Sequence, residues 1–186
     1  MSKTHESIDP ELAAWIGKQS VFFVATAPLS PDGHINASPK GGNSFRILGP
    51  REVAYQDYTG SGAETAAHLN DNGRIVIMFC AFEGSPRILR LHGRGAVIKP
   101  GHARFSEMAT HFPPHPSTRA FVHVLVTRVS TSCGYGVPLM EFRERRDTLE
   151  RWAISKGPDG LEQYRAAKNH RSIDGLPAFD GESSAR

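Results

Sequence analysis

Cysteine, long apolar runs and blocks of basic residues are scarce or missing in this 186-residue sequence. Two cysteines, Cys80 and Cys133, are too few for a disulfide framework, and we expect both to be thiols. No apolar run reaches the roughly 18 residues of a membrane-spanning helix, and the formal net charge is only +3. We therefore expect neither a membrane nor a nucleic acid as partner. The opening MSKTHESIDPEL is too polar for a secretory signal, which favours a cytoplasmic protein.

Several well-known catalytic patterns are also missing. The phosphate loop G-x-x-x-x-G-K-[ST] is absent, and Gly60-x-Gly62-x-x-Thr65 lacks the third glycine of the dinucleotide-binding fingerprint. His111 and His115 have the spacing of a metal pair, but intervening prolines prevent a regular helix and no Cys or carboxylate cluster joins them. We expect no metal site. No Ser/His/Asp or paired-carboxylate arrangement is visible either, so no catalytic side chain is assigned.

Short apolar or alternating segments, separated by turn residues, fill most of the first 130 positions. We expect strands at 20–27, 34–40, 45–48, 53–58, 75–82, 87–99 and 121–130. Because few helices lie between them, the chain is predicted to be mainly β, a six- or seven-stranded antiparallel barrel with short peripheral helices. Gly93 and Gly95 interrupt one strand, which predicts a bulge or the close approach of another backbone or a ligand.

Helices are expected mainly at the two ends of the chain. Asp9-Pro10 has the pattern of a helix N-cap followed by the first helical residue. Two further helices are predicted at about 141–155 and 159–168, and the tail DGESSAR is predicted to be disordered. The chain is thus divided into an N-terminal helix that packs on the barrel, the barrel itself, a helical extension of the same domain and a tail, at 1–19, 20–140, 141–175 and 176–186.

The stretch YTGSGAETAAHLNDNGR places small and hydroxyl residues before a short helix. Ser61 and Glu64 have the spacing of a capping box that opens a helix near Gly62, and Asn72-Gly73 has the pattern of a left-handed stop. The first turn of a helix leaves backbone N–H groups unpaired and carries partial positive charge, so this loop suits a phosphate. The same residues would also form an ordinary cap and turn without any ligand.

Four segments carry a resemblance to a known family: FFVATAPLSPDGHINASPKGG, VAYQDYTGSGAETAAHL, GRIVIMFCAFEGSPRILRLHGRGAV and SCGYGVPLM. In this order, over about two thirds of the chain, they resemble the pyridoxamine 5′-phosphate oxidase-like, FMN-binding split-barrel family. The resemblance implies an FMN-binding homodimer with cofactor sites at the subunit interface, and a flavin-dependent oxidoreductase acting on a small molecule. Deazaflavin- or haem-binding relatives and a non-enzymatic flavin-binding or sensor protein remain the alternatives.

The resemblance also indicates positions for the cofactor. Residues 36–40 match the strand that faces the flavin, and Tyr58-Thr59 match the family's Tyr-Thr pair beside FMN. Where the oxidases have an Arg-Lys pair at the phosphate, this chain has Glu64 and Thr65, so Lys40 and Arg90 are expected to supply positive charge. The predicted cofactor-binding residues are Asn36, Ser38, Lys40, Tyr58, Thr59, Ser61, Gly62, Thr65 and Arg90.

Two further departures concern the substrate. The hairpin between the lysine and the tyrosine is lengthened by GGNSFRILGPRE, and the C-terminal KNHRSIDGLPAF does not match the oxidases' motif that grips the vitamin B6 phosphate. The chain is therefore predicted to be a relative of the oxidase and not the oxidase itself.

Overall fold

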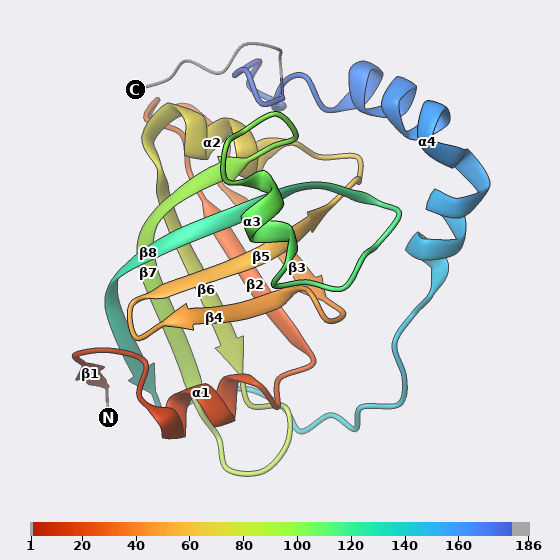
Figure 1. Ribbon diagram of the computed structural model, residues 1–186. Coiled ribbons are helices and arrows are strands. Elements are labelled where there is room, and N and C mark those ends of the chain that lie inside the picture. The colour runs from red at the N-terminus through yellow and green to blue at the C-terminus, as the bar shows by residue number, and fades with distance from the viewer. Residues whose placement is uncertain (1, 180–186) are drawn as a thin grey trace.

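One antiparallel sheet dominates the computed structural model, which describes residues 2–179, and it curls into a half-barrel (Figure 1). The predicted tail at 180–186 lies outside the described residues. A short first strand, β1 (Lys3–His5), pairs with β8 and is absent from the sequence-based prediction. The other seven strands match the predicted set: β2 (Val21–Thr26), β3 (Asn36–Gly41), β4 (Phe45–Gly49), β5 (Glu52–Tyr58), β6 (Arg74–Cys80), β7 (Ile88–Ile98) and β8 (Thr118–Ser132).

The strand order explains why the barrel is open on one side. Across the sheet the order is β3-β2-β6-β7-β8-β5-β4, with β1 added beside β8. β3 and β4 are therefore the two ends, and within residues 2–179 no backbone ladder joins them. We call the opening between β3 and the β4–β5 hairpin the seam. The prediction of an antiparallel split barrel is confirmed.

The barrel core is built from alternating inward-facing side chains, with an aromatic cluster at one end. Phe22 packs against Phe45, Tyr55 and Phe79, with ring centroids 5.2, 5.6 and 5.7 Å away. Such tilted and edge-on pairs add about 0.5–1.5 kcal/mol beyond the area that they bury. β4 and β5 are thereby held against β2 and β6 across the barrel interior.

Gly93 marks the bulge that the sequence predicts. The β7–β8 register shifts between His92 and Gly93. A Cβ atom at Gly93 would lie only 2.4 Å from the carbonyl oxygen of Leu125, so no larger residue fits there without moving the backbone. The extra residue of the bulge is Thr127 of β8, so β8 bends here while β7 keeps an unbroken register with β6.

The N-terminal helix α1 (Pro10–Ile16) begins at Pro10, where the sequence predicts its start, and it covers one end of the barrel (Figure 1). The carboxylate of Asp9 accepts a hydrogen bond from the backbone N–H of Leu12 at 2.8 Å, which caps the helix. Leu12 and Ile16 are buried in the main core. α1 thus closes the barrel with its apolar face.

Helix α2 (Glu64–Asn72) ends at Gly73, which has the predicted left-handed conformation with φ of 70°. The predicted capping box is wrong. The residue at the N-cap is Ala63, no side chain caps the helix, and the helix begins at Glu64 instead of near Gly62. The Glu64 carboxylate instead accepts a hydrogen bond from the N–H of Ile173 at 3.3 Å. The Glu64 carboxylate therefore bonds to a backbone N–H that is far away in the sequence, and not to its predicted capping partner Ser61.

The C-terminal part differs from the prediction in its boundaries. A short helix, α3 (Phe105–Ala109), precedes β8 and is not predicted. The first predicted C-terminal helix starts at Thr148 and not at 141. The two predicted C-terminal helices together form α4 (Thr148–Lys168), which is broken at Gly157, where φ is 65° and ψ is 173°. Residues 133–147, here called the connecting segment, have no regular secondary structure. Among the described helices none is long and apolar enough to cross a membrane.

Candidate functional site

The seam carries a row of polar side chains on its β3 side. Successive side chains of a strand alternate in direction, so Asn36, Ser38 and Lys40 share one face of β3. Their partners in β2 are Thr26, Val24 and Phe22, all of which are buried. Asn36, Ser38 and Lys40 therefore face the barrel interior across the seam, toward the end of β5 and the start of α2.

Asp57 is the acidic centre of this region. Its side chain is 4% exposed and bonds to two cations, with Lys40 Nζ at 3.1 Å from Oδ1 and Arg119 Nε at 2.7 Å from Oδ2. Burial by itself would raise the pKa of the Asp57 carboxyl, but the Lys40 ammonium and the Arg119 guanidinium hold this pKa below its usual value. Asp57 is therefore a carboxylate that ties β3, β5 and β8 together.

The loop 59–63 receives further positive charge from α4. Arg165 donates from Nε to Thr59 Oγ1 at 2.8 Å, and Arg119 donates from Nη1 to the carbonyl oxygen of Gly62 at 2.9 Å. Thr59 is buried, whereas Ser61 and Gly62 are exposed. Burial lowers the pKa of the Arg165 guanidinium, and the charge of Arg119 lowers it further. Two like charges are thus held close together beside the open part of this loop.

Three cations and two carboxylates lie around the loop. Asp57 bonds to Lys40 and Arg119, and the Glu64 carboxylate lies beside Gly62. Arg165, which is half-buried, bonds among residues 2–179 only to the neutral oxygens of Thr59 and Thr118, so its charge can still be shared with an anion. The α2 N-terminus, with no side-chain cap, adds partial positive charge. This arrangement can bind a phosphate or a carboxylate.

A buried hydrogen-bond network continues from the seam to the underside of α2. Asn36 Nδ2 donates to Thr26 Oγ1 at 3.1 Å and to Thr65 Oγ1 at 3.0 Å. Thr26 Oγ1 also bonds to His68 Nδ1 at 2.9 Å. Burial lowers the pKa of His68, so its imidazole is neutral at pH 7. His68 Nε2 and the Tyr55 hydroxyl are buried without a hydrogen-bond partner in the described part of the chain.

Tyr58 is fixed at the outer rim of the loop. Its ring stacks on His115 with the centroids 4.2 Å apart, and its hydroxyl donates to Gln56 Oε1 at 3.3 Å. Burial raises the pKa of the Tyr58 phenol. The stacking on His115 covers one ring face, so a cofactor ring could approach only the other.

The C-terminal segment 169–179 folds back over α2 and the loop. Asn169 Nδ2 donates to the carbonyl oxygen of Gly60 at 2.9 Å, and Ala178 packs with three alanines at the start of α2. The guanidinium of Arg119 lies 4.8 Å from the centroid of the Phe179 ring. The carboxylate of Asp174 pairs with His34, just before β3. The loop is therefore covered on the side of this segment, while Ser61 and Gly62 stay open.

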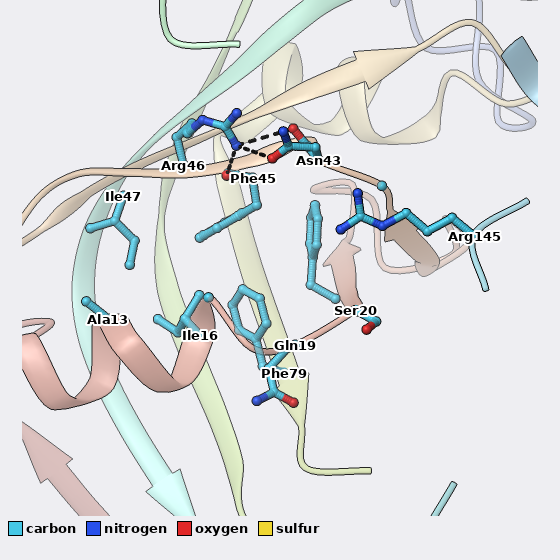
Figure 2. Close-up of a pocket in the computed structure, with 13 residues that line it drawn as sticks. Ala13, Ile16, Gln19, Ser20, Asn43, Phe45, Arg46, Ile47, Phe79 and Arg145 are labelled. Carbon is cyan, nitrogen blue, oxygen red and sulfur yellow. Dashed lines mark hydrogen bonds between the residues drawn. The ribbon is translucent and has the colours of Figure 1, made fainter. Parts of the chain in front are cut away.

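A separate pocket of about 210 Å³ opens at the barrel end next to α1 (Figure 2). None of the nine predicted cofactor residues lines it. It does come close to one of them, Tyr58, because a Cβ atom at Gly42, a lining residue, would lie 3.9 Å from the Tyr58 hydroxyl. Ten lining side chains are labelled in Figure 2, among them Phe45, Phe79 and Arg46.

The structure brings most of the predicted cofactor residues together and separates one from them. Asn36, Ser38, Lys40, Tyr58, Thr59, Ser61, Gly62 and Thr65 all lie along the seam or its loop. Arg90 does not. It faces outward on β7, between the buried Leu89 and Leu91, and donates to Ser132 Oγ at 3.1 Å. In the described residues no contact joins it to this chain's own loop.

Sequence reasoning missed three charged residues of the site. Asp57 lies at the end of a predicted strand. Arg119 lies just before the predicted start of its strand at 121, and Arg165 lies in a predicted helix. Nothing local distinguishes Arg119 and Arg165 from ordinary solvent-exposed charges. Asp57 does carry a local signal, because it is a lone acid in the otherwise uncharged strand segment 53–58, and an acid in such a buried segment needs a partner.

Comparisons with known proteins identify the family. Residues 8–133 match the family described as pyridoxamine 5′-phosphate oxidase. The chain belongs to this family. A pyridoxamine 5′-phosphate oxidase family protein of Aspergillus flavus, ustO, is 38% identical over 194 residues, covering 94% of this chain and 77% of that protein.

Solved structures agree on the fold. The HupZ protein of Group A Streptococcus, at 24% identity, superposes with a TM-score of 0.54 over 67% of this chain and 99% of that one. A Clostridium acetobutylicum protein related to general stress protein 26 has 13% identity and a TM-score of 0.52, covering 75% and 94% of the two chains. At these identities the likeness shows the shared pyridoxamine 5′-phosphate oxidase-like barrel and no more.

Proposed function

We propose that the protein binds FMN along the seam and is a flavin-dependent oxidoreductase acting on a small organic molecule. Membership of the pyridoxamine 5′-phosphate oxidase family supports a flavin as cofactor. The observation that carries the proposal is the convergence of Arg119 and Arg165 on the loop 59–63, beside a helix N-terminus without a cap. Two guanidinium groups there replace the basic pair that the oxidases have where this chain has Glu64 and Thr65.

The donor set suits a phosphate monoester. Guanidinium groups match phosphate oxygens in geometry and charge, and the exposed backbone at Ser61 and Gly62 offers N–H donors at the start of a helix. The Glu64 carboxylate accepts a hydrogen bond from the Ile173 N–H through Oε1, and its Oε2 lies beside Gly62, so Arg119 and Arg165 have to offset this negative charge when a phosphate binds. The residues present therefore fit the charged end of FMN.

When bound, FMN supplies the hydride chemistry, and the residues of this chain bind and orient it. Lys40 and Asn36 would face the ring system from β3, and Tyr58 would border it with the ring face that His115 leaves free. Lys40 is held in place by Asp57, so its position is set before any ligand arrives. No side chain is required as a general base.

A homodimer with the cofactor site at the interface is part of this proposal. The outer sheet face has a half-buried apolar patch, in which Phe23 pairs with Met78 and Ala25 with Val76. Leu139, Met140 and Phe142 of the connecting segment are exposed, Leu139 by 78%. Apolar groups gathered in this way are typical of subunit interfaces. Arg90, on the same outer face, would then approach the partner's cofactor.

Purified protein tests the proposal directly. The protein is denatured, the released chromophore is identified by mass, and native protein is assayed for turnover with NAD(P)H or oxygen. We expect FMN and turnover. Release of deazaflavin or haem would support the alternative that the chain is a deazaflavin- or haem-binding split-barrel protein. FMN without turnover would support the alternative of a non-enzymatic flavin-binding or sensor protein. A colourless protein that does not bind added FMN would reject the proposal. Light scattering measures the mass, which should be that of two chains.

A further inference from the structure

Asn169 is the first residue after α4, and it is completely buried against the loop 59–63. Its Nδ2 donates to the carbonyl oxygen of Gly60 at 2.9 Å. Because a carbonyl oxygen can only accept a hydrogen bond, this contact fixes which end of the amide faces the loop. The other end, Oδ1, is buried without a partner in the described part of the chain.

The unpaired oxygen makes Asn169 an unfavourable residue for packing alone, because a buried acceptor without a hydrogen bond destabilises a fold. The backbone needs no side chain to hold its position here, since the N–H of Asn169 donates to the carbonyl oxygen of Arg165 at 2.8 Å. Among residues 2–179 the bond to Gly60 is the one hydrogen bond that this side chain makes. The effect of that bond on the loop therefore decides what the residue does.

The hydrogen bond from Asn169 sets the direction of the peptide group between Gly60 and Ser61. In a trans peptide the C=O and the N–H lie in one plane and point in opposite directions, and no peptide bond of the described chain is cis. With the carbonyl oxygen of Gly60 held by Asn169, the N–H of Ser61 points away from the C-terminal segment 169–179. It therefore faces the side of the loop that this segment leaves open.

The N–H of Ser61 is available to a ligand. Ser61 is exposed, and within the part of the chain that the structure describes its N–H donates to no other backbone group. It lies just before α2, whose N-terminus carries partial positive charge and has no side-chain cap. Because the Glu64 carboxylate lies beside Gly62, an anion at this loop depends on each donor that points toward it.

Arg165 reaches the loop from the same end of α4. Its Nε donates to Thr59 Oγ1 at 2.8 Å, one residue before Gly60. Residues that are four positions apart at a helix end lie on the same face, one above the other, so Arg165 and Asn169 approach the loop together. The end of α4 thus supplies both a positive charge and a constraint on the loop backbone.

We propose that Asn169 is a positioning residue for phosphate binding, which turns the N–H of Ser61 toward the phosphate without touching the phosphate itself. Asn169 belongs to KNHRSIDGLPAF, the C-terminal sequence that does not match the oxidases' motif for the vitamin B6 phosphate. In this chain that part of the sequence serves the cofactor loop instead. The identity of the phosphate as that of FMN rests on the proposed function, whereas the orientation of the Ser61 N–H does not.

Fluorescence titration of the flavin-free full chain with FMN and with riboflavin, which lacks the phosphate, tests the proposal. Wild type should bind FMN more tightly than riboflavin. Asn169→Ala should weaken FMN binding about tenfold, the effect of one hydrogen bond to a charged group, and leave riboflavin binding unchanged. General damage to the fold would weaken both. The control is Asn70→Ala, because Asn70 Nδ2 donates to the carbonyl oxygen of Ala178 at 2.8 Å, in the same C-terminal segment but not in the loop.

If wild type prefers FMN and Asn169→Ala keeps the same preference, the role of Asn169 is overturned and the flavin assignment stands. An equal loss of FMN affinity in Asn70→Ala would overturn it too.

A second measurement needs neither flavin nor a folded variant. In an NMR titration of wild type with inorganic phosphate, the amide resonance of Ser61 should shift. A shift in a protein that binds no FMN would support the role of Asn169 and reject the flavin assignment. An amide of Ser61 that does not respond to phosphate would overturn the proposal, because its N–H would then not face the anion.

Discussion

The Nζ atom of Lys40 lies 3.1 Å from Oδ1 of Asp57, and this ion pair crosses the seam between β3 and β5. Arg119 of β8 holds the other oxygen of the same carboxylate at 2.7 Å. One buried acid thus links both edges of the opening to the middle of the sheet. Side-chain ion pairs therefore bridge the seam, which no backbone ladder crosses within residues 2–179. They also shape the site where the cofactor is proposed to bind.

Asp57→Asn is expected to destabilise the fold strongly, because it leaves Lys40 and Arg119 without their carboxylate. Removing one partner of a buried pair typically costs about 3–5 kcal/mol. Urea unfolding of flavin-free protein at pH 7 measures the free energy of unfolding. Asp147→Asn, which breaks the exposed pair with Arg151, is the control and should change it by less than about 0.5 kcal/mol. Equal effects of the two substitutions would contradict a structural role for Asp57.

Acidification should remove the same contribution. The pKa of Asp57 is lowered in the folded protein. Its carboxylate therefore stabilises the fold at pH values above the ordinary Asp pKa of about 3.9 and loses this effect as pH falls through the folded-state pKa. Between pH 5 and the acid limit of folding, wild type should lose more stability than Asp57→Asn does. Parallel pH profiles of the two proteins would show that Asp57 does not titrate in this way.

Arg165→Gln should weaken FMN binding about ten- to a hundredfold, because a hydrogen bond to a charged group contributes about 1.5–3 kcal/mol. Fluorescence titration of flavin-free protein with FMN measures the dissociation constant. Arg151→Gln, on the exposed surface of the same helix, is the matched control. Since Arg165 also contacts Thr59 and Thr118, the free energy of unfolding is measured for each variant. Unchanged FMN affinity in a folded Arg165→Gln protein would place the phosphate elsewhere.

Gly93→Ala should destabilise the barrel by about 1–3 kcal/mol, the usual cost of overpacking, because the new methyl group would lie 2.4 Å from the Leu125 carbonyl oxygen. Thermal unfolding followed by circular dichroism measures the effect. Gly136→Ala serves as the control, since a Cβ atom there meets no atom within 4 Å. A melting temperature that falls no further than in the control would mean that the bulge accommodates alanine.

His68 should make the fold less stable as pH falls below about 6.5. Burial lowers the pKa of His68 in the folded state, so the unfolded chain takes up the proton first as pH falls. Its stabilising effect is complete above the ordinary His pKa and decreases toward the folded-state value, by about 1.4 kcal/mol for each unit between the two. Urea unfolding of wild type and His68→Gln from pH 7.5 to 5 measures the free energy of unfolding of each protein. The difference between the two pH profiles is the contribution of His68, because His92 and His115 are present in both proteins. An NMR titration that protonates His68 at its ordinary pKa would contradict the expectation.

The strands and helix ends could be predicted because their signals are local. Alternating apolar residues define seven strands, Asp9-Pro10 defines the start of α1, and Asn72-Gly73 ends α2. The capping box at Ser61 and Glu64 has an equally local signal, and that prediction failed. Glu64 bonds to the N–H of Ile173, a residue 109 positions away, and this donor is available only after the C-terminal segment has docked.

The amino-acid sequence alone therefore determined the class of fold and the family resemblance, and it predicted candidate cofactor residues along β3 and the Tyr58-Thr59 loop. The tertiary structure decided which charges meet there. Lys40 and Asp57 are 17 positions apart, and Arg165 and Thr59 are 106 positions apart. Whether such residues touch depends on strand register, on the open side of the barrel and on where α4 packs. Periodicity and spacing report only a residue's near neighbours, so the positive centre of the site emerges only in the folded chain.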